Sequence, residues 1–133
     1  MSTLVDDLIA TAGAHLHPHR SDDRVFGDVA ATLVTVDGNR YSGVCIDTGS
    51  GTGFCAEHSA VAAMVTAREY RIALIVAVCR DDTGTLYVLP PCGRCREFLR
   101  QIDERNLDTQ VVLGADVVLP LRELLPHHEW PIP

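Results

Sequence analysis

Hydrophobic side chains recur at helical spacing in three segments of the chain. Residues 3–14, 55–70 and 92–105 each place apolar side chains three or four positions apart, with polar residues between them. Side chains at that spacing share one face of a helix, which can then pack against a core. The pattern therefore predicts three amphipathic helices.

Other segments favour strands. Residues 29–36 and 40–47 are rich in β-branched side chains, and the Asp37-Gly38 pair between them is typical of a hairpin turn. Residues 72–79 form a continuous apolar run, which predicts a strand buried on both faces. Shorter strands are expected at residues 85–89 and 111–113. Because helices and strands alternate, the order predicts an α/β fold of three layers, with helices on both faces of the sheet.

Composition narrows the classes of function. The 133 residues are enough to bury a hydrophobic core, and we expect one domain over residues 1–133. The chain has no apolar run long enough to span a bilayer and no export-signal pattern, so we expect a cytoplasmic protein without a membrane partner. A net charge of −7 and the absence of lysine argue against nucleic acid, whose binding proteins cluster basic residues. A small neutral or cationic ligand fits better.

Two cysteine motifs carry the candidate chemistry. Five cysteines, an odd number, favour reduced thiols that bind metal or take part in catalysis. Cys55, in Gly-Phe-Cys-Ala-Glu-His, and Cys92 and Cys95, in Pro-Pro-Cys-Gly-Arg-Cys, lie at the starts of predicted helices, where free N–H groups stabilise thiolates. Three such ligands can bind Zn²⁺ and leave a fourth position open for water, as in catalytic zinc sites. Glu57 could reach that water and carry its protons without binding the metal.

Two other interpretations of the cysteines remain open. A closed structural zinc site would recruit His58, Cys45 or Cys79 as its fourth ligand. A thioredoxin-like redox role for Cys92 and Cys95 would require aromatic neighbours and an earlier position in the chain. Neither interpretation gives a role to the glutamate of the first motif.

The two motifs and the segments around them resemble the zinc-dependent cytidine deaminase superfamily. Cys-Ala-Glu at 55–57, the apolar run at 72–78 and Pro-Cys-x-x-Cys at 91–95 occur in the order and at roughly the spacing of small cytidine deaminases. Within the superfamily, Cys-Gly-Arg-Cys-Arg at 92–96 and Arg-Glu-Leu-Leu-Pro at 122–126 are most similar to the blasticidin S deaminase type. The resemblance covers most of the chain from about residue 29 onward.

This resemblance implies a mechanism and an assembly. Cys55, Cys92 and Cys95 would hold one Zn²⁺, and Glu57 would carry protons. The implied reaction is hydrolysis of a cytosine nucleoside or an analogue, of the cytidine, deoxycytidine or blasticidin S kind, to the uracil form with release of ammonia. The resemblance also implies a mixed five-stranded sheet and a homotetramer.

Several positions that would contact the substrate depart from the cytidine deaminase pattern. The Asn-x-Glu that binds the sugar hydroxyls in these enzymes is replaced by Cys45 and Asp47, and a thiol lacks the paired donor and acceptor of an amide. Phe26 falls one residue from the position of a substrate-packing aromatic side chain. Trp130, near the C-terminus, could stack on a base or anchor the chain end. The departures leave the substrate open.

The position after the glutamate also differs, because an arginine that often hydrogen-bonds the zinc thiolates is replaced by His58. We therefore expect His58, Arg94 or Arg96 to balance the charge of the thiolates.

The alternatives to a cytosine nucleoside deaminase are a deaminase of another aminated heterocycle and a non-catalytic, zinc-stabilised domain that binds a small molecule or a partner protein.

Overall fold

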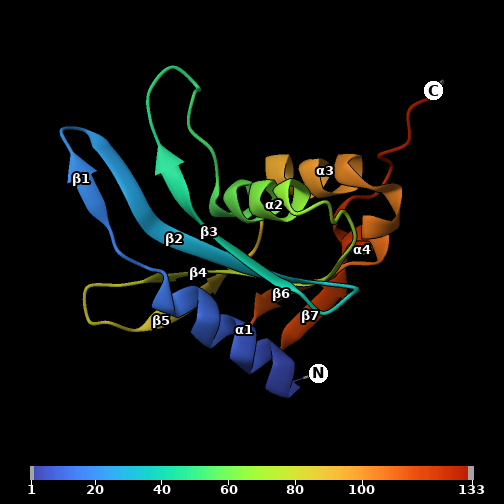
Figure 1. Cartoon of the computed structure of the whole chain (residues 1–133), viewed down its shortest axis with the longest axis horizontal. Coiled ribbons are helices and arrows are strands. Elements are labelled where there is room, and N and C mark those ends of the chain that lie inside the picture. Colours follow the sequence, from blue (N-terminus) through green and yellow to red (C-terminus); the bar gives the residue numbers. More distant parts are fainter. Residues whose placement is uncertain (1, 132–133) are drawn as a thin grey trace.

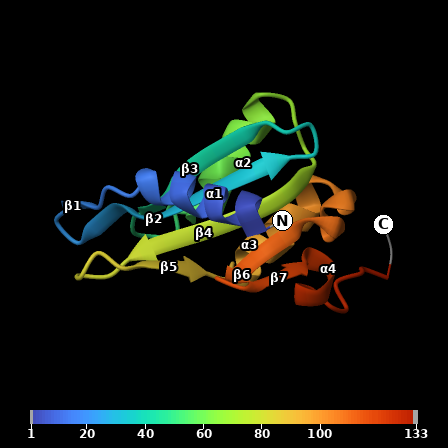
Figure 2. The same ribbon diagram turned by 90° about the horizontal axis from the view of Figure 1, so that it is seen from below.

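The computed structural model, which describes residues 2–131, has three layers (Figure 1). Helix α1 (Ser2–Ala14) covers one face of a mixed sheet, while α2 (Ala56–Thr66) and α3 (Gly93–Ile102) cover the other. Figure 2 shows α1 lying across the middle of the sheet. A 3₁₀ turn (Glu104–Asp108) follows α3, and a short α4 (Leu121–Leu124) lies near the C-terminus. The predicted α/β sandwich is confirmed.

Strand β4 lies at the centre of the sheet. It pairs antiparallel with β2 along one edge, and parallel β6 and antiparallel β5 share its other edge. Strand β3 pairs with the free edge of β2, and β7 closes the far side against β6. The strands are β1 (His19–Ser21), β2 (Arg24–Thr35), β3 (Arg40–Asp47), β4 (Ile72–Arg80), β5 (Leu86–Leu89), β6 (Gln110–Gly114) and β7 (Val117–Pro120).

The sheet has seven strands, and the expected number of five is therefore corrected. The additions are β1 and β7, both short. All three residues of β1 are exposed and polar, so no hydrophobic pattern marks this strand. The apolar residues of β7 follow those of β6 after a short turn at residues 115–116, directly after Gly114, the last residue of β6; this glycine is a hairpin signal that the sequence does offer.

Two hydrophobic clusters fill the spaces between the layers. Alternate residues of β2 and β4 supply them, because successive side chains of a strand point to opposite faces. Leu33 and Ile75 pack under α2 and α3, whereas Val34 and Val76 pack against α1. Residues 74–78 are all buried, which confirms the prediction of a strand buried on both faces. None of the helices within residues 2–131 is both long and apolar enough to cross a lipid bilayer.

Candidate metal and catalytic site

The three motif cysteines meet where two helices begin. Cys55 is the N-cap residue of α2, Cys92 is the N-cap residue of α3, and Cys95 lies in the first turn of α3. Both N-cap residues have extended backbone and make no side-chain cap bond, so their thiols are free to face each other. The Sγ atoms of Cys55 and Cys92 are 3.9 Å apart and those of Cys92 and Cys95 are 3.6 Å apart.

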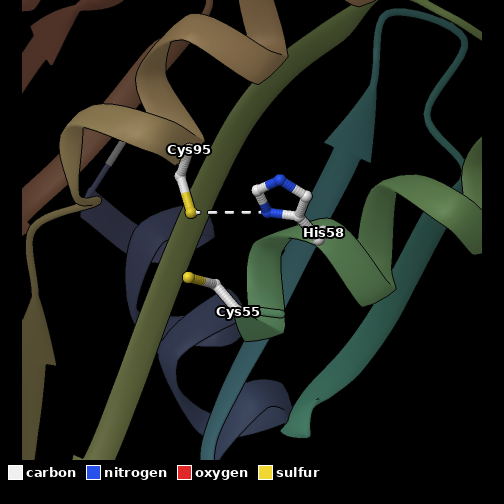
Figure 3. A group of neighbouring side chains, drawn as sticks. All are labelled: Cys55, His58 and Cys95. Atoms are coloured by element: carbon white, nitrogen blue, oxygen red, sulfur yellow. Dashed lines mark hydrogen bonds between the residues drawn. The ribbon is translucent and has the colours of Figure 1, made fainter. Parts of the chain in front are cut away.

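This donor set fits zinc. The Sγ atoms of Cys55 and Cys95 also lie within 4.8 Å of each other, and Figure 3 shows both pointing into one space between the helices. Thiolates about 2.3 Å from a tetrahedral Zn²⁺ are separated by about 3.8 Å, close to the distances found here. Burial raises the pKa of the Cys55 and Cys95 thiols. A bound cation would therefore favour their ionised form.

The imidazole ring of His58 lies beside two of the three cysteines. Its Nδ1 lies 3.6 Å from Cys95 Sγ, and one of its ring nitrogens lies within 4.8 Å of the Cys55 sulfur (Figure 3). The ring stacks on Phe98, with centroids 4.0 Å apart and planes 12° apart. Burial, and then the positive charge of Arg94, lower the pKa of His58, which favours the neutral imidazole. A neutral ring can donate one hydrogen bond to a thiolate or bind a metal.

The two arginines proposed for charge balance bond to backbone carbonyls. Arg94 donates to the oxygen of Gly53 at 3.4 Å. Arg96 donates to the oxygens of Pro91 at 2.9 Å and Leu124 at 3.2 Å. Arg96 therefore ties the start of α3 to α4. Its role, and that of Arg94, in balancing the thiolates stays a prediction.

Glu57 lies on the first turn of α2 and faces the same space. Its side chain is only 6 % exposed, and burial raises the pKa of its carboxyl group. A carboxyl group whose pKa is raised accepts a proton more readily than an exposed one, as a general acid and base must do. The structure thus places a candidate proton carrier beside the candidate metal ligands.

A cleft of about 230 Å³ joins the thiols to a second cluster of polar side chains. Its lining residues are Asp28, Val29, Cys45, Asp47, Cys55, Ala56, Glu57, Ala77, Leu89, Pro90, Cys92 and Cys95. The predicted substrate contacts Cys45 and Asp47 are among them. An additional one is Asp28, whose Oδ1 accepts a hydrogen bond from Cys45 Sγ at 2.8 Å.

The sequence patterns did not predict a role for Asp28. It follows Gly27 near the start of β2, where the chain was expected to be outside a strand. A glycine within a strand is a signal for a bulge, and Gly27 was the one feature of the sequence that could have indicated this contact.

Two predicted substrate contacts lie elsewhere in the chain. Phe26 stacks on His19, with ring centroids 6.1 Å apart, and it does not line the cleft. Trp130 is 69 % exposed, and the guanidinium of Arg100 lies 5.6 Å from the centre of its ring. Any contact of these side chains with a substrate stays a prediction.

The fold and the site together describe an α/β protein with a thiol cluster and a buried glutamate at one end of its sheet. No protein-family model matches the chain, and no curated protein sequence does. Among solved structures, cytidine deaminases are similar. The enzyme from Mycobacterium leprae is 25 % identical with a TM-score of 0.74, over 92 % of this chain and 98 % of that one.

The cytidine deaminase from Burkholderia pseudomallei is 26 % identical with a TM-score of 0.70, over 92 % of this chain and 96 % of that one. The cytidine deaminase from Bacillus anthracis is similar in fold, with 23 % identity, a TM-score of 0.71 and coverage of 95 % and 86 %. All three structures confirm the α/β fold with its mixed sheet. The enzymes from Mycobacterium leprae and Burkholderia pseudomallei also support the cytidine deaminase superfamily. The cluster of Cys55, His58 and Cys95 is compatible with zinc.

Proposed function

We propose that the protein is a zinc-dependent hydrolytic deaminase that converts the cytosine ring of a nucleoside, or of a nucleoside analogue, to uracil with release of ammonia. The main observation in support is that three thiols and a buried carboxyl group meet in one cleft of a cytidine deaminase-like fold. The neighbouring structures support a cytosine deaminase in general terms, and the nucleoside itself belongs to the proposal.

Each group at the site has a role in this proposal. Cys55, Cys92 and Cys95 would hold the metal, which when bound supplies a Lewis acid that lowers the pKa of water to about 7. Glu57 takes a proton from the attacking water and delivers it to the exocyclic amine. The water oxygen ends on C4 of the ring, the C4–N bond breaks, and the amine leaves as ammonia.

The expected homotetramer would also bear on substrate binding. The cleft is open on one side in a single chain, and Trp130 lies outside it. In this proposal, a neighbouring chain covers the opening and brings Trp130 or Phe26 near the substrate. Light scattering with size-exclusion chromatography would measure the mass of the assembly, and a monomer at working concentration would contradict this part of the proposal.

The test of the function is ammonia release from the zinc-loaded protein with cytidine, deoxycytidine, cytosine and blasticidin S. Glu57→Gln should lower kcat by about 10²–10⁴-fold, because the proton carrier is lost, while zinc content stays unchanged. Glu123→Gln, an exposed change on α4, is the matched control. Full turnover in Glu57→Gln would rule out the assigned mechanism.

A second candidate function is favoured by the position of His58. Its Nδ1 is close enough to the sulfur of Cys95 to complete a closed zinc site. The protein would then be a non-catalytic, zinc-stabilised domain. This alternative predicts an imidazole signal in X-ray absorption at the zinc edge, loss of zinc in His58→Ala, and no ammonia from any substrate. The deaminase predicts three sulfurs and one oxygen around the metal.

A further inference from the structure

A second hollow, of about 180 Å³, lies at the other end of α2 and β2 from the thiols. Three segments line it: the turn after β2, the loop from α2 to β4, and the 3₁₀ turn after α3. Figure 1 shows the first two side by side, at the end of the sheet opposite β1. The lining residues, which we call the arginine hollow, are Val36, Asp37, Arg68, Glu69, Tyr70, Arg71 and Arg105. None of them lines the cleft of the thiols.

Hydrogen bonds hold the three segments of the arginine hollow together. The backbone N–H of Val36 donates to the carbonyl oxygen of Arg71 at 3.1 Å, which joins the turn after β2 to the loop. The buried side chain of Asn106 donates to the carbonyl oxygen of Tyr70 at 3.0 Å, which joins the 3₁₀ turn to the same loop. The backbone around the hollow is therefore held in place without a ligand, and a preformed site loses less entropy on binding.

Positive charge gathers at the arginine hollow. Three of the eleven arginines of the chain line it, although the net charge of the whole chain is −7. Within residues 2–131, neither Arg68 nor Arg71 forms an ion pair. Arg105 donates through Nε and Nη2 to the carboxylate of Asp103, which leaves the N–H groups of its Nη1 for a ligand. The hollow thus offers several charged donors.

Two carboxylates also line the hollow, but neither forms an ion pair with its arginines among the described residues. Glu69 faces the β2–β3 hairpin, where its Oε2 accepts hydrogen bonds from the hydroxyl of Tyr41 and, at 3.0 Å, from the side-chain amide of Asn39. Asp37 is exposed in the turn of that hairpin, where water and ions screen its charge. The guanidinium groups therefore keep their donors for another acceptor.

The backbone of Arg68 is an independent observation. Arg68 follows Ala67, the C-cap residue of α2, and its φ is +67°. Glycine is the usual residue at this position of a helix end, because a side chain is strained in the left-handed region. Strain of this kind is retained where the side chain has a use. A cation at the end of a helix also stabilises the helix dipole, so the experiment has to separate stability from binding.

We propose that the arginine hollow binds the phosphate group of a small phosphorylated molecule through Arg68 and Arg71, with Arg105 adding donors. Guanidinium groups form paired, charge-assisted hydrogen bonds with phosphate oxygens. A phosphate monoester carries nearly two negative charges at neutral pH, so it can neutralise both unpaired guanidinium groups, whereas a carboxylate carries only one. Tyr70 and Val36, both about half exposed, offer apolar surface to the rest of the molecule. The site goes beyond the proposed deaminase function and does not depend on it.

Calorimetry on the zinc-loaded protein tests the inference with ribose 5-phosphate and with ribose, which lacks only the phosphate. Ribose 5-phosphate should bind at least about tenfold more tightly than ribose at low salt, and inorganic phosphate should compete with it. The preference should shrink as salt is raised, because ions screen charged contacts. Binding should persist after a chelator removes the zinc, because the hollow contains none of the proposed metal ligands.

Variants locate the binding and separate it from stability. Arg68→Gln and Arg71→Gln should each weaken the binding of ribose 5-phosphate at least about tenfold. Arg20→Gln, an exposed change on β1 outside the hollow, is the matched control and should leave it unchanged. Arg68→Gly also relieves the backbone strain, so it should unfold at a higher urea concentration than Arg68→Gln but bind ribose 5-phosphate equally weakly. Circular dichroism checks that each variant is folded.

Three results would overturn the inference. The first is ribose 5-phosphate binding no more tightly than ribose. The second is binding that is unchanged in both Arg68→Gln and Arg71→Gln, which would place the phosphate elsewhere. The third is binding that disappears when zinc is removed, which would assign the phosphate to the cleft of the thiols. Ammonia release from cytidine, measured on the same samples, tests the proposed function separately, because the arginine hollow shares no residue with that cleft.

Discussion

The protonation of Cys45 predicts a specific dependence of stability on pH. Burial is the main cause that raises the pKa of this thiol from 9.0 to about 11, and the hydrogen bond to Asp28 adds to it. In the unfolded chain the thiol would ionise near its ordinary pKa. The folded state therefore keeps a proton that the unfolded state loses, and the contribution of Cys45 to stability declines as pH rises from about 9 to about 11.

The size of this effect follows from the shift. Each unit of pKa corresponds to about 1.4 kcal/mol, so two units correspond to about 2–3 kcal/mol. The measurement is urea unfolding, followed by circular dichroism under reducing conditions, of the unmodified protein and of Cys45→Ala. The difference in unfolding free energy between the two should be constant below pH 9 and should fall by about that amount by pH 11. Groups that titrate in both proteins cancel in the difference.

A companion variant separates the two causes of the shift. Asp28→Asn removes the carboxylate but keeps the burial, so the decline should still begin near pH 9 and should be smaller at pH 11. A difference between the unmodified protein and Cys45→Ala that is flat from pH 8 to pH 11 would refute the reasoning. In that case Cys45 would titrate normally, and the side of the cleft formed by Asp28, Cys45 and Asp47 would gain a negative charge at high pH.

Three further predictions concern packing and the metal. Gly43→Ala should lower the free energy of unfolding, measured in urea, by about 1–3 kcal/mol, because a Cβ there would overlap the backbone of α2. Unchanged stability would contradict this packing. Asn106→Ala should lower the same free energy by about 3 kcal/mol, because the buried side-chain amide of Asn106 forms hydrogen bonds with three backbone groups. Asn39→Ala, a change at an exposed residue, should lower it far less. Arg96→Ala should weaken zinc retention about tenfold in a chelator competition, because Arg96 holds the carbonyl of Pro91 before α3; equal retention would limit Arg96 to joining the helices.

Local patterns explain how much of the fold was predictable. The helices, the hairpin of β2 and β3, and the strand β4 with its buried residues 74–78 depend on the spacing of apolar residues within one segment, and the structure confirms them. The starts of α2 and α3 at Cys55 and Cys92 also follow from short motifs. Strand β1 could not be predicted, because three exposed polar residues form a strand only through pairing with β2.

The candidate site likewise has a part that local motifs predict and a part that depends on the pairing of strands. The thiols and Glu57 lie at the ends of helices, and their spacing in the sequence is enough to indicate which side chains can meet. Asp28 lies beside Cys45 because of the bulge in β2, which is defined only when the two strands pair. No period or motif within one segment specifies that contact.

The proposed reacting groups and the residues on the opposite side of the cleft are positioned by different parts of the fold. The groups proposed to break the C–N bond are fixed by the starts of α2 and α3, whereas the contact between Asp28 and Cys45 is fixed by the pairing of β2 with β3. A change at Asp28 should leave both helix starts in place, because within residues 2–131 the Asp28 side chain is hydrogen-bonded to the thiol of Cys45 and to no residue of the helices. Substitutions in the bulge can therefore alter which small molecule the cleft accepts while the proposed metal ligands keep their geometry. Conversely, loss of zinc should leave the hydrogen bond from Cys45 to Asp28 intact.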